Sequence, residues 1–334
     1  PGKRHFVASS QSALSTQALT VTDAPSHSPE GACLAAIDLG SNSFHLNISQ
    51  VDRGQIRPIH TLSERVQLGE ATDTGALTQA AIGRGLACLE HFKQLLDETS
   101  PCQIRIVGTH ALRRATNRRD FITPAEALLG MPVEVLPGEE EARLIYTGVA
   151  HTLPDNQACH LVIDVGGGST EFILGSNAKP IRLESLPLGC VSYGEAFFSK
   201  GEITAARFDA ACYQATQDVS LLCQRFNHTP WQETIGASGT LLALEKIIVT
   251  AGWRSSGIDR ASLSALRQKL LAFDHVGDID LAGLSAHRKA VVTAGLAITQ
   301  GIFDGLCLDA MNTSTSALRE GVIYELLAQS PHEQ

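Results

Sequence analysis

The feature that most constrains the fold is a hairpin motif that occurs twice. The first copy is AAIDLGSNSFHLNI, residues 35–48, and the second is LVIDVGGGSTEFIL, residues 161–174. When Asp38 is aligned with Asp164, each copy reads as an apolar strand, an Asp, a polar glycine-containing turn and a second apolar strand. Such a pattern predicts a β-hairpin. Two matched hairpins predict two related domains that arose by duplication.

The segments that follow each hairpin alternate between strand and helix patterns. Residues 77–98 have apolar positions at helical spacing, with Thr78 as a candidate cap. Three segments have the order strand, turn, helix: 104–115, 133–150 and 233–248. Two further segments are predicted as helices: 287–306 and 316–328. Alternation of this kind is typical of an α/β fold.

The length of 334 residues favours two domains over a single core. Residues 1–31 begin with a stretch rich in Ser, Thr, Ala and Gln that lacks the apolar segment of a secretory signal, and we expect a flexible tail there. We expect the two domains at 32–144 and 145–334. A cleft between two such domains is a common place for a ligand.

Charge and composition disfavour several classes of protein. The formal net charge is −9 and only 5% of residues are aromatic. Binding to DNA, to a membrane surface or to single-stranded nucleic acid is therefore not expected. No apolar run reaches the roughly 20 residues of a transmembrane helix. The 8 cysteines form no C-x-x-C pair and the 12 histidines show no metal-binding spacing, which favours free thiols and a cytoplasmic location.

The turns of the two hairpins are candidate phosphate sites. A tight turn directs several backbone N–H groups the same way and so attracts anions. Glycine permits positive φ and close approach of a phosphate, and Ser adds a hydroxyl donor. Ordinary hairpin turns are the alternative explanation, but matched copies favour phosphate. The candidate binding residues are Gly40, Ser41, Asn42 and Ser43 in the first loop, and Gly166, Gly167, Gly168 and Ser169 in the second.

Acidic residues occur beside these loops and at one helix start. A carboxylate beside a phosphate site indicates a cation or a proton-transfer role, and Mg²⁺ is the cation usually shared by carboxylates and phosphates. The candidate Mg²⁺ ligands are Asp38, Asp164 and Glu171. Acids also favour the first turn of a helix through its dipole. One of three such acids is a candidate general base: Glu139, Glu140 or Glu141.

Basic residues gather in THALRRATNRRDF, residues 109–121. An arginine forms paired, charge-assisted hydrogen bonds with a phosphate and lowers the barrier of phosphoryl transfer. Charge clusters are nevertheless most often solvated helix faces, so we expect at least two of the four arginines to lie on such a face. The four are Arg113, Arg114, Arg118 and Arg119.

Taken together, these motifs resemble the Ppx/GppA phosphatases. That family contains exopolyphosphatases and guanosine pentaphosphate (pppGpp) phosphohydrolases, and it lies in the actin-like ATPase superfamily. The resemblance covers roughly residues 33–328. It rests on seven motifs in the same order: AIDLGSNSFHL, VGTHALRRATN, GEEEARLIYTGVAHT, VIDVGGGSTEFILG, LPLGCVSYGEAFF, IGASGT and ALREGVIYE. It implies an α/β fold of two actin-like (ribonuclease H-like) domains with an interdomain cleft.

The resemblance also implies roles for individual residues. Arg113 matches the arginine that binds the terminal phosphate, and Glu141 matches the glutamate that activates the attacking water. Asp164 and Glu171 match acidic residues linked to Mg²⁺ and water, and the two glycine loops match the phosphate loops. GGGSTE and THALR are closer to the exopolyphosphatase branch, because the pentaphosphatase branch often has Ala at the third glycine of the second loop.

The expected function is therefore Mg²⁺-assisted release of orthophosphate from the end of inorganic polyphosphate, with pppGpp hydrolysis as the alternative. An actin-like kinase and a non-catalytic phosphate sensor are two further candidates. Ser316 stands where the family commonly has glycine. Longer members carry an extra helical region that grips long chains and dimerises. Its absence here predicts weaker processivity, and a homodimer is expected as a partner arrangement.

Overall fold

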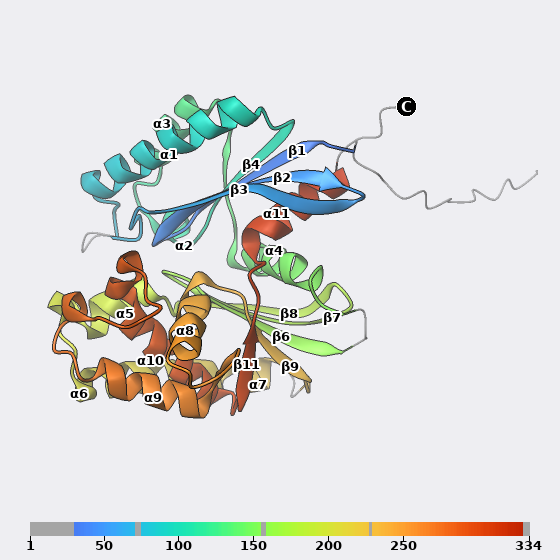
Figure 1. Ribbon diagram of the computed structural model, residues 1–334. Helices are drawn as coiled ribbons and strands as arrows, with labels where there is room; N and C mark the ends of the chain where they lie inside the picture. Colours follow the sequence, from blue (N-terminus) through green and yellow to red (C-terminus); the bar gives the residue numbers. More distant parts are fainter. Residues whose placement is uncertain (1–29, 71–74, 155–157, 227–228, 330–334) are drawn as a thin grey trace, which may run out of the picture.

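The computed structural model of the protein describes residues 30–70, 75–154, 158–226 and 229–329 (Figure 1). Two β-sheets, one from each half of the chain, are covered by helices. Of the predicted tail, residues 1–29 lie outside the described residues, and Glu30 and Gly31 form a turn. Within the described residues, no helix combines the length and the apolar content needed to cross a membrane.

The first sheet has the strand order β3-β2-β1-β4-β5. β1 pairs antiparallel with β2 and parallel with β4, so the strand that carries Asp38 lies at the centre. Residues 55–65 form β3, which continues the hairpin of β1 and β2. The strands are β1 (Cys33–Leu39), β2 (Ser43–Asp52), β3 (Gln55–Arg65), β4 (Gln103–Gly108) and β5 (Val133–Val135).

The second sheet has the order β10-β11-β9-β6-β7-β8. β6 carries Asp164, pairs antiparallel with β7 and parallel with β9, and so occupies the place of β1. The strands are β6 (Cys159–Val165), β7 (Thr170–Ser176), β8 (Lys179–Leu186), β9 (Glu233–Gly236), β10 (Ile258–Asp259) and β11 (Ala310–Thr313). In both sheets the central strand pairs antiparallel with the second strand of its hairpin on one side and parallel with a later strand on the other, and a third antiparallel strand follows the hairpin. This is the strand order of an actin-like (ribonuclease H-like) domain, and it confirms the predicted fold class.

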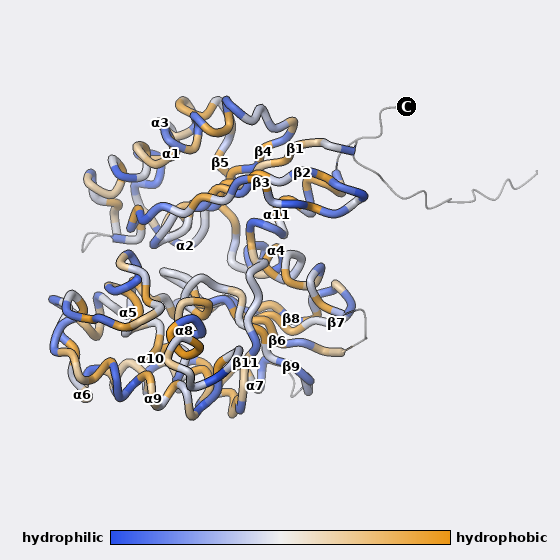
Figure 2. Tube along the Cα trace, in the orientation of Figure 1, coloured by the Kyte–Doolittle hydropathy of each residue, from blue (hydrophilic) through white to orange (hydrophobic). Residues whose placement is uncertain are grey.

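The central strands are apolar because both of their faces are buried. In β1, Ala35 and Ile37 face one hydrophobic cluster, whereas Leu34 and Ala36 face another. Successive strand residues point to opposite sides of a sheet, so a strand covered on both faces is apolar throughout. Figure 2 shows this hydrophobic character along the inner strands of each sheet. The unbroken apolar runs before each loop follow from this double burial.

The helices follow the predicted order. Thr78 caps α1, where its side chain accepts a hydrogen bond from the Ala81 N–H. The helices of the first half are α1 (Gln79–Thr99), α2 (His110–Arg114), α3 (Arg119–Leu129) and α4 (Gly138–Ala150). Those of the second half are α5 (Cys190–Phe197), α6 (Ala205–Ser220), α7 (Leu222–Arg225), α8 (Gly239–Thr250), α9 (Arg260–Leu270), α10 (Lys289–Gly305) and α11 (Leu318–Gln329).

α4 and α11 lie between the two sheets and pack against each other (Figure 1). They approach closely at Gly148 and Gly321, where an added Cβ on Gly321 would overlap the backbone of α4. α11 also contacts β1, although it belongs to the range assigned to the second domain. The division between residues 144 and 145 lies inside α4 and stays a prediction.

Candidate active site

The first glycine loop joins β1 to β2 with its carbonyl groups turned away from the second domain. The Ser41 carbonyl accepts a hydrogen bond from the Gly69 N–H (2.8 Å). The Asn42 carbonyl accepts from the N–H groups of Val66 (3.1 Å) and Gln67 (2.8 Å). Among the described residues, the N–H groups of Ser41 and Asn42 have no acceptor. They are therefore available to an anion.

The second loop joins β6 to β7 in the same way. The Gly166 N–H closes the hairpin on the Ser169 carbonyl (2.9 Å). The carbonyl groups of Gly166 and Gly167 accept from Cys190 (3.0 Å) and Val191 (2.8 Å) at the start of α5. The N–H groups of Gly167 and Gly168 have no acceptor within the part of the chain that the structure describes. The two loops thus offer matching sets of donors.

The loops face each other and touch. A Cβ added to Gly167 would lie 2.9 Å from the Ser41 Cβ and 3.0 Å from the Asn42 nitrogen. Gly40, Gly166, Gly167 and Gly168 do not use the positive φ that glycine permits. A Cβ on Gly168 would instead meet the His110 ring, and one on Gly40 or Gly166 would meet a carbonyl group of its own loop. Glycine is therefore required by close packing and not by the backbone dihedral angle.

Replacing Gly168 by Ala is expected to lower kcat/KM at least about 10-fold and to destabilise the fold by about 1–3 kcal/mol. A Cβ at this position would overlap the His110 ring, which lines the same cavity. The double variant Gly168→Ala, His110→Ala removes the overlap and should recover thermal stability. Phosphate-release kinetics and thermal melts measure both effects. A Gly168→Ala variant that matches the wild type in both would show that this contact does not constrain the loop.

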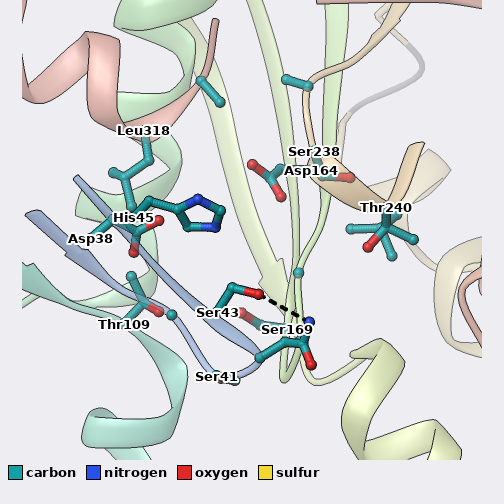
Figure 3. Close-up of a pocket in the computed structure, with 18 of the residues that line it drawn as sticks. Asp38, Ser41, Ser43, His45, Thr109, Asp164, Ser169, Ser238, Thr240 and Leu318 are labelled. Atoms are coloured by element: carbon teal, nitrogen blue, oxygen red, sulfur yellow. Dashed lines mark hydrogen bonds between the residues drawn. The ribbon is translucent and has the colours of Figure 1, made fainter. Parts of the chain in front are cut away.

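A cavity of about 150 Å³ lies between the two sheets, at the loops. Figure 3 shows Asp38, Ser43 and His45 on one side of it and Asp164, Ser169 and Ser238 on the other. Helix starts also border it, because Gly239 begins α8 and Arg319 lies at the start of α11. The predicted residues that line it are Asp38, Gly40, Ser41, Asn42, Ser43, Glu141, Asp164, Gly166, Gly167, Gly168 and Ser169.

Asp38 and Asp164 end the two central strands and are both inside the cavity. Burial raises the pKa of Asp38 to about 7, while Arg319 acts in the opposite direction. Burial raises the pKa of Asp164 to about 8, with further upward contributions from Glu141 and Asp38. The Asp38 Oδ1 is buried without a hydrogen-bond partner among the described residues. Such an orphaned oxygen fits a cation or a protonated ligand.

The raised pKa of Asp164 makes stability depend on pH. The folded protein keeps a proton up to about pH 8, whereas the unfolded chain releases it near 3.8. This stabilising contribution is therefore complete below the unfolded value and is lost as the pH rises through the folded value. In EDTA, Asp164→Asn is expected to raise the Tm over wild type by about 4 °C or more near pH 8.5, and by much less near pH 5. Thermal melts at both pH values test this, and an equal difference at both would contradict it.

The buried Glu141, at the start of α4, forms an ion pair with the half-buried Arg113. The Arg113 Nη1 donates to the Glu141 Oε2 (2.9 Å) and to the Leu136 carbonyl (2.7 Å). Burial raises the pKa of Glu141, and Arg113 opposes that shift. Glu141 lines the cavity, but Arg113 does not and reaches it only through Glu141. The binding of a terminal phosphate by Arg113 stays a prediction.

Glu171 lies behind the cavity wall. The Ser185 hydroxyl donates to its Oε1 (2.8 Å), and Ser169 also hydrogen-bonds its carboxylate. Burial raises the pKa of Glu171 well above its usual value, with Glu141 and Asp164 adding to the effect. Glu171 is not among the residues that line the cavity, and its role as a metal ligand stays a prediction.

Two arginines outside the set of predicted site residues line the cavity. Arg288 immediately precedes α10 and Arg319 lies in α11. Among the residues the structure describes, neither guanidinium forms an ion pair. Both act on the pKa of Asp164. Arg319 is held in place by its neighbour, because the Glu320 carboxylate accepts from Asn47 (2.9 Å) and from the Ala317 N–H (2.8 Å). The signal for Arg319 was present in the ALREG motif.

The donor set fits Mg²⁺ when a phosphate supplies the remaining ligands. In the described ranges, no three His, Cys, Asp or Glu side chains form a ready-made metal cluster. Mg²⁺ commonly uses only one or two carboxylates together with substrate phosphates and water. Asp38, with its unpartnered Oδ1, and Asp164, near the ends of β1 and β6, would supply those carboxylates.

Two proteins are similar to this chain in sequence over most of its length. A Haemophilus influenzae protein named "Putative exopolyphosphatase" is 38% identical over 303 residues, which cover 90% of this chain and 94% of the relative. A Photobacterium profundum protein named "Guanosine-5'-triphosphate,3'-diphosphate pyrophosphatase" is 36% identical over 305 residues. That match covers 91% of this chain but 61% of the relative, so the chain spans about three fifths of its length.

A solved structure and a family profile match the chain as well. The crystal structure of an exopolyphosphatase from Cytophaga hutchinsonii superposes with a TM-score of 0.80 at 25% identity, covering 88% of this chain and 97% of that chain. The sequence profile of the Ppx/GppA phosphatase family matches residues 47–330. The range matched by the family profile includes the second glycine loop, the Arg113–Glu141 pair and the cavity arginines. The chain therefore belongs to the Ppx/GppA phosphatase family.

Proposed function

We propose that this chain hydrolyses the terminal phosphoanhydride bond of inorganic polyphosphate and releases orthophosphate. The observation that carries the proposal is the convergence of both glycine loops and Glu141 on one cavity. Free N–H groups suit the oxygens of a terminal phosphate, and a carboxylate beside them suits a water molecule. A site that only binds phosphate has no need of buried carboxylates, so hydrolysis explains the cavity better than a sensor does.

In the proposed step, a water molecule beside Glu141 attacks the terminal phosphorus in line with the bridging oxygen. A P–O bond forms to the water oxygen, and a water proton moves to the Glu141 carboxylate. The bridging P–O bond breaks, and its electron pair stays on the shortened chain. Because burial raises the pKa of Glu141, its carboxylate accepts a proton more readily than an exposed glutamate does. Positioning and charge neutralisation supply most of the rate.

We assign two sides to the cavity from the arginines that act on its carboxyl groups. Arg113 acts on the pKa of Glu141, whereas Arg288 and Arg319 act on Asp164. We place the attacking water on the Arg113 side and the leaving chain on the side of Arg288 and Arg319. Guanidinium groups there neutralise the charge that develops on the leaving phosphate. Mg²⁺, held by Asp38 and Asp164, would supply further neutralisation of the phosphate oxygens.

Polyphosphate is favoured as substrate by a contact between two motifs. Gly168 of GGGSTE packs against His110 of THALR, and an Ala in its place would overlap that ring. The chain thus carries both features of the exopolyphosphatase branch in one contact. Hydrolysis of pppGpp is the second candidate, because the Photobacterium profundum relative is named for it. A homodimer and a cytoplasmic location stay predictions from the sequence.

Phosphate release from polyphosphate of defined length, measured beside release from pppGpp with and without Mg²⁺, tests the proposal. We expect Mg²⁺-dependent release with the higher kcat/KM on polyphosphate. The reverse order of kcat/KM would establish the pppGpp alternative. Phosphorylation of a small alcohol without free phosphate would instead indicate a kinase, and release from neither substrate would overturn the hydrolase proposal.

A further inference from the structure

A second cavity, of about 480 Å³, lies next to the Arg113–Glu141 pair. We propose that it binds orthophosphate after hydrolysis, on the side from which the water attacks. The source of that phosphate rests on the proposed function, but the site itself rests on its own residues. Its lining includes Arg113, Arg118, Arg119, Glu126, Val133 and Leu136.

The charge of this second cavity favours an anion. Arg118 and Arg119 are exposed, and neither forms an ion pair with any residue in the described ranges. Glu126 is the acid in the lining, and its Oε1 already accepts from the Val133 N–H (2.9 Å). Three guanidinium groups against one carboxylate leave a net positive site on a chain whose formal charge is −9. Guanidinium groups bind phosphate oxygens in pairs.

Asn117 fixes the position of these arginines. Its Oδ1 accepts from the Leu77 N–H (2.7 Å), and its Nδ2 donates to the Leu77 carbonyl (3.2 Å). The Asn117 carbonyl accepts from the Asp120 N–H (2.9 Å) at the first turn of α3. The turn between α2 and α3 is therefore tied to the start of α1. Arg118 and Arg119 project from a fixed backbone, which reduces the entropy lost when they bind a ligand.

Arg113 connects the two cavities. Its Nη1 is occupied by Glu141 and by the Leu136 carbonyl. Its remaining N–H groups have no acceptor among the described residues and lie at the wall of the second cavity. In-line attack places the water oxygen, and then the released orthophosphate, on the Glu141 side. The first cation that this product meets is Arg113, followed by Arg118 and Arg119, while the shortened chain stays on the opposite side.

Titration of inorganic phosphate into the protein in EDTA, without substrate, tests the site directly. We expect Arg118→Ala, Arg119→Ala to weaken phosphate binding by about 10-fold, since two charge-assisted contacts at an exposed site are lost. The product-inhibition constant of orthophosphate should rise by the same factor, with the KM for polyphosphate nearly unchanged. The control Arg57→Ala, Arg182→Ala removes two exposed strand arginines that have no ion pair in the described residues, and it should bind phosphate like the wild type.

The outcomes separate the site from the proposed function. Equal phosphate affinity in the wild type and in Arg118→Ala, Arg119→Ala overturns the site, as does equal loss in the control. A raised KM for long polyphosphate with unchanged phosphate affinity also overturns it, because the cavity then holds substrate. Arginine-dependent phosphate binding in a protein that releases no phosphate from either substrate would keep the site and reject the hydrolase proposal. Circular dichroism spectra of each variant, compared with the wild type, serve as the control for folding.

Discussion

Replacing Glu141 by Gln is expected to lower kcat by about 10²- to 10⁴-fold, the range typical of a lost general base. Gln keeps the size of the side chain and an acceptor for Arg113, but it cannot take a proton from water. Substrate affinity should change little, because both glycine loops remain intact. Steady-state phosphate release gives kcat, and calorimetric titration with polyphosphate in EDTA gives the dissociation constant.

The control for this variant is Glu139→Gln in the same helical turn. Glu139 is exposed and is not part of the cavity lining. It carries the same charge, so its variant corrects for the change in net charge and for the helix dipole. Wild-type kcat is expected for Glu139→Gln. If Glu141→Gln also kept wild-type kcat, the water would have to be activated by another group.

Replacing Arg319 by Met is expected to lower kcat/KM by about 10²- to 10³-fold, the magnitude seen when one preorganised charge-stabilising donor is removed. Arg319 lines the cavity and lowers the pKa of both Asp38 and Asp164. Met fills similar volume without the positive charge. Both carboxyl pKa values should therefore rise, so the acid limb of the pH–rate profile should move to higher pH. Rates measured across that limb test both effects.

Arg57→Met is the matched control for Arg319→Met. Arg57 is exposed on β3, and its replacement removes one positive charge outside the cavity lining. The control should leave both kcat/KM and the pH profile unchanged. A loss of less than about three-fold for Arg319→Met, with an unmoved acid limb, would show that Arg319 takes no part in charge stabilisation.

The hairpins could be predicted because neighbouring residues in the sequence determine them. Asp38 and Asp164 each follow an apolar strand and precede a turn, and that order fixes their place at the ends of the central strands. Neighbouring residues could not show which of the three glutamates, Glu139, Glu140 or Glu141, faces the cavity. Glu139 is exposed and Glu140 pairs with Arg143. The direction in which α4 packs decides which of the three glutamates enters the cavity.

No motif contained Arg288, and the ALREGVIYE motif contained Arg319 without showing that it faces the cavity, because long-range packing places both side chains. α11 returns from the second half of the chain to contact β1, and this brings Arg319 toward Asp38. The sequence near the second loop also could not show why that loop needs glycine. Gly167 and Gly168 are required by contacts with Ser41 and His110 from the other domain, and those contacts exist only after the two halves have packed together.

A crystal structure of the Glu141→Gln variant with tripolyphosphate most directly tests the central claim that the two loops hold a terminal phosphate. We predict that the terminal phosphate accepts hydrogen bonds from Ser41 and Asn42 on one side and from Gly167 and Gly168 on the other. The substituted side chain at position 141 should face it, and the remaining phosphates should extend toward Arg288 and Arg319. A ligand bound outside the space between the loops, or one whose terminal phosphate points away from position 141, would contradict the account.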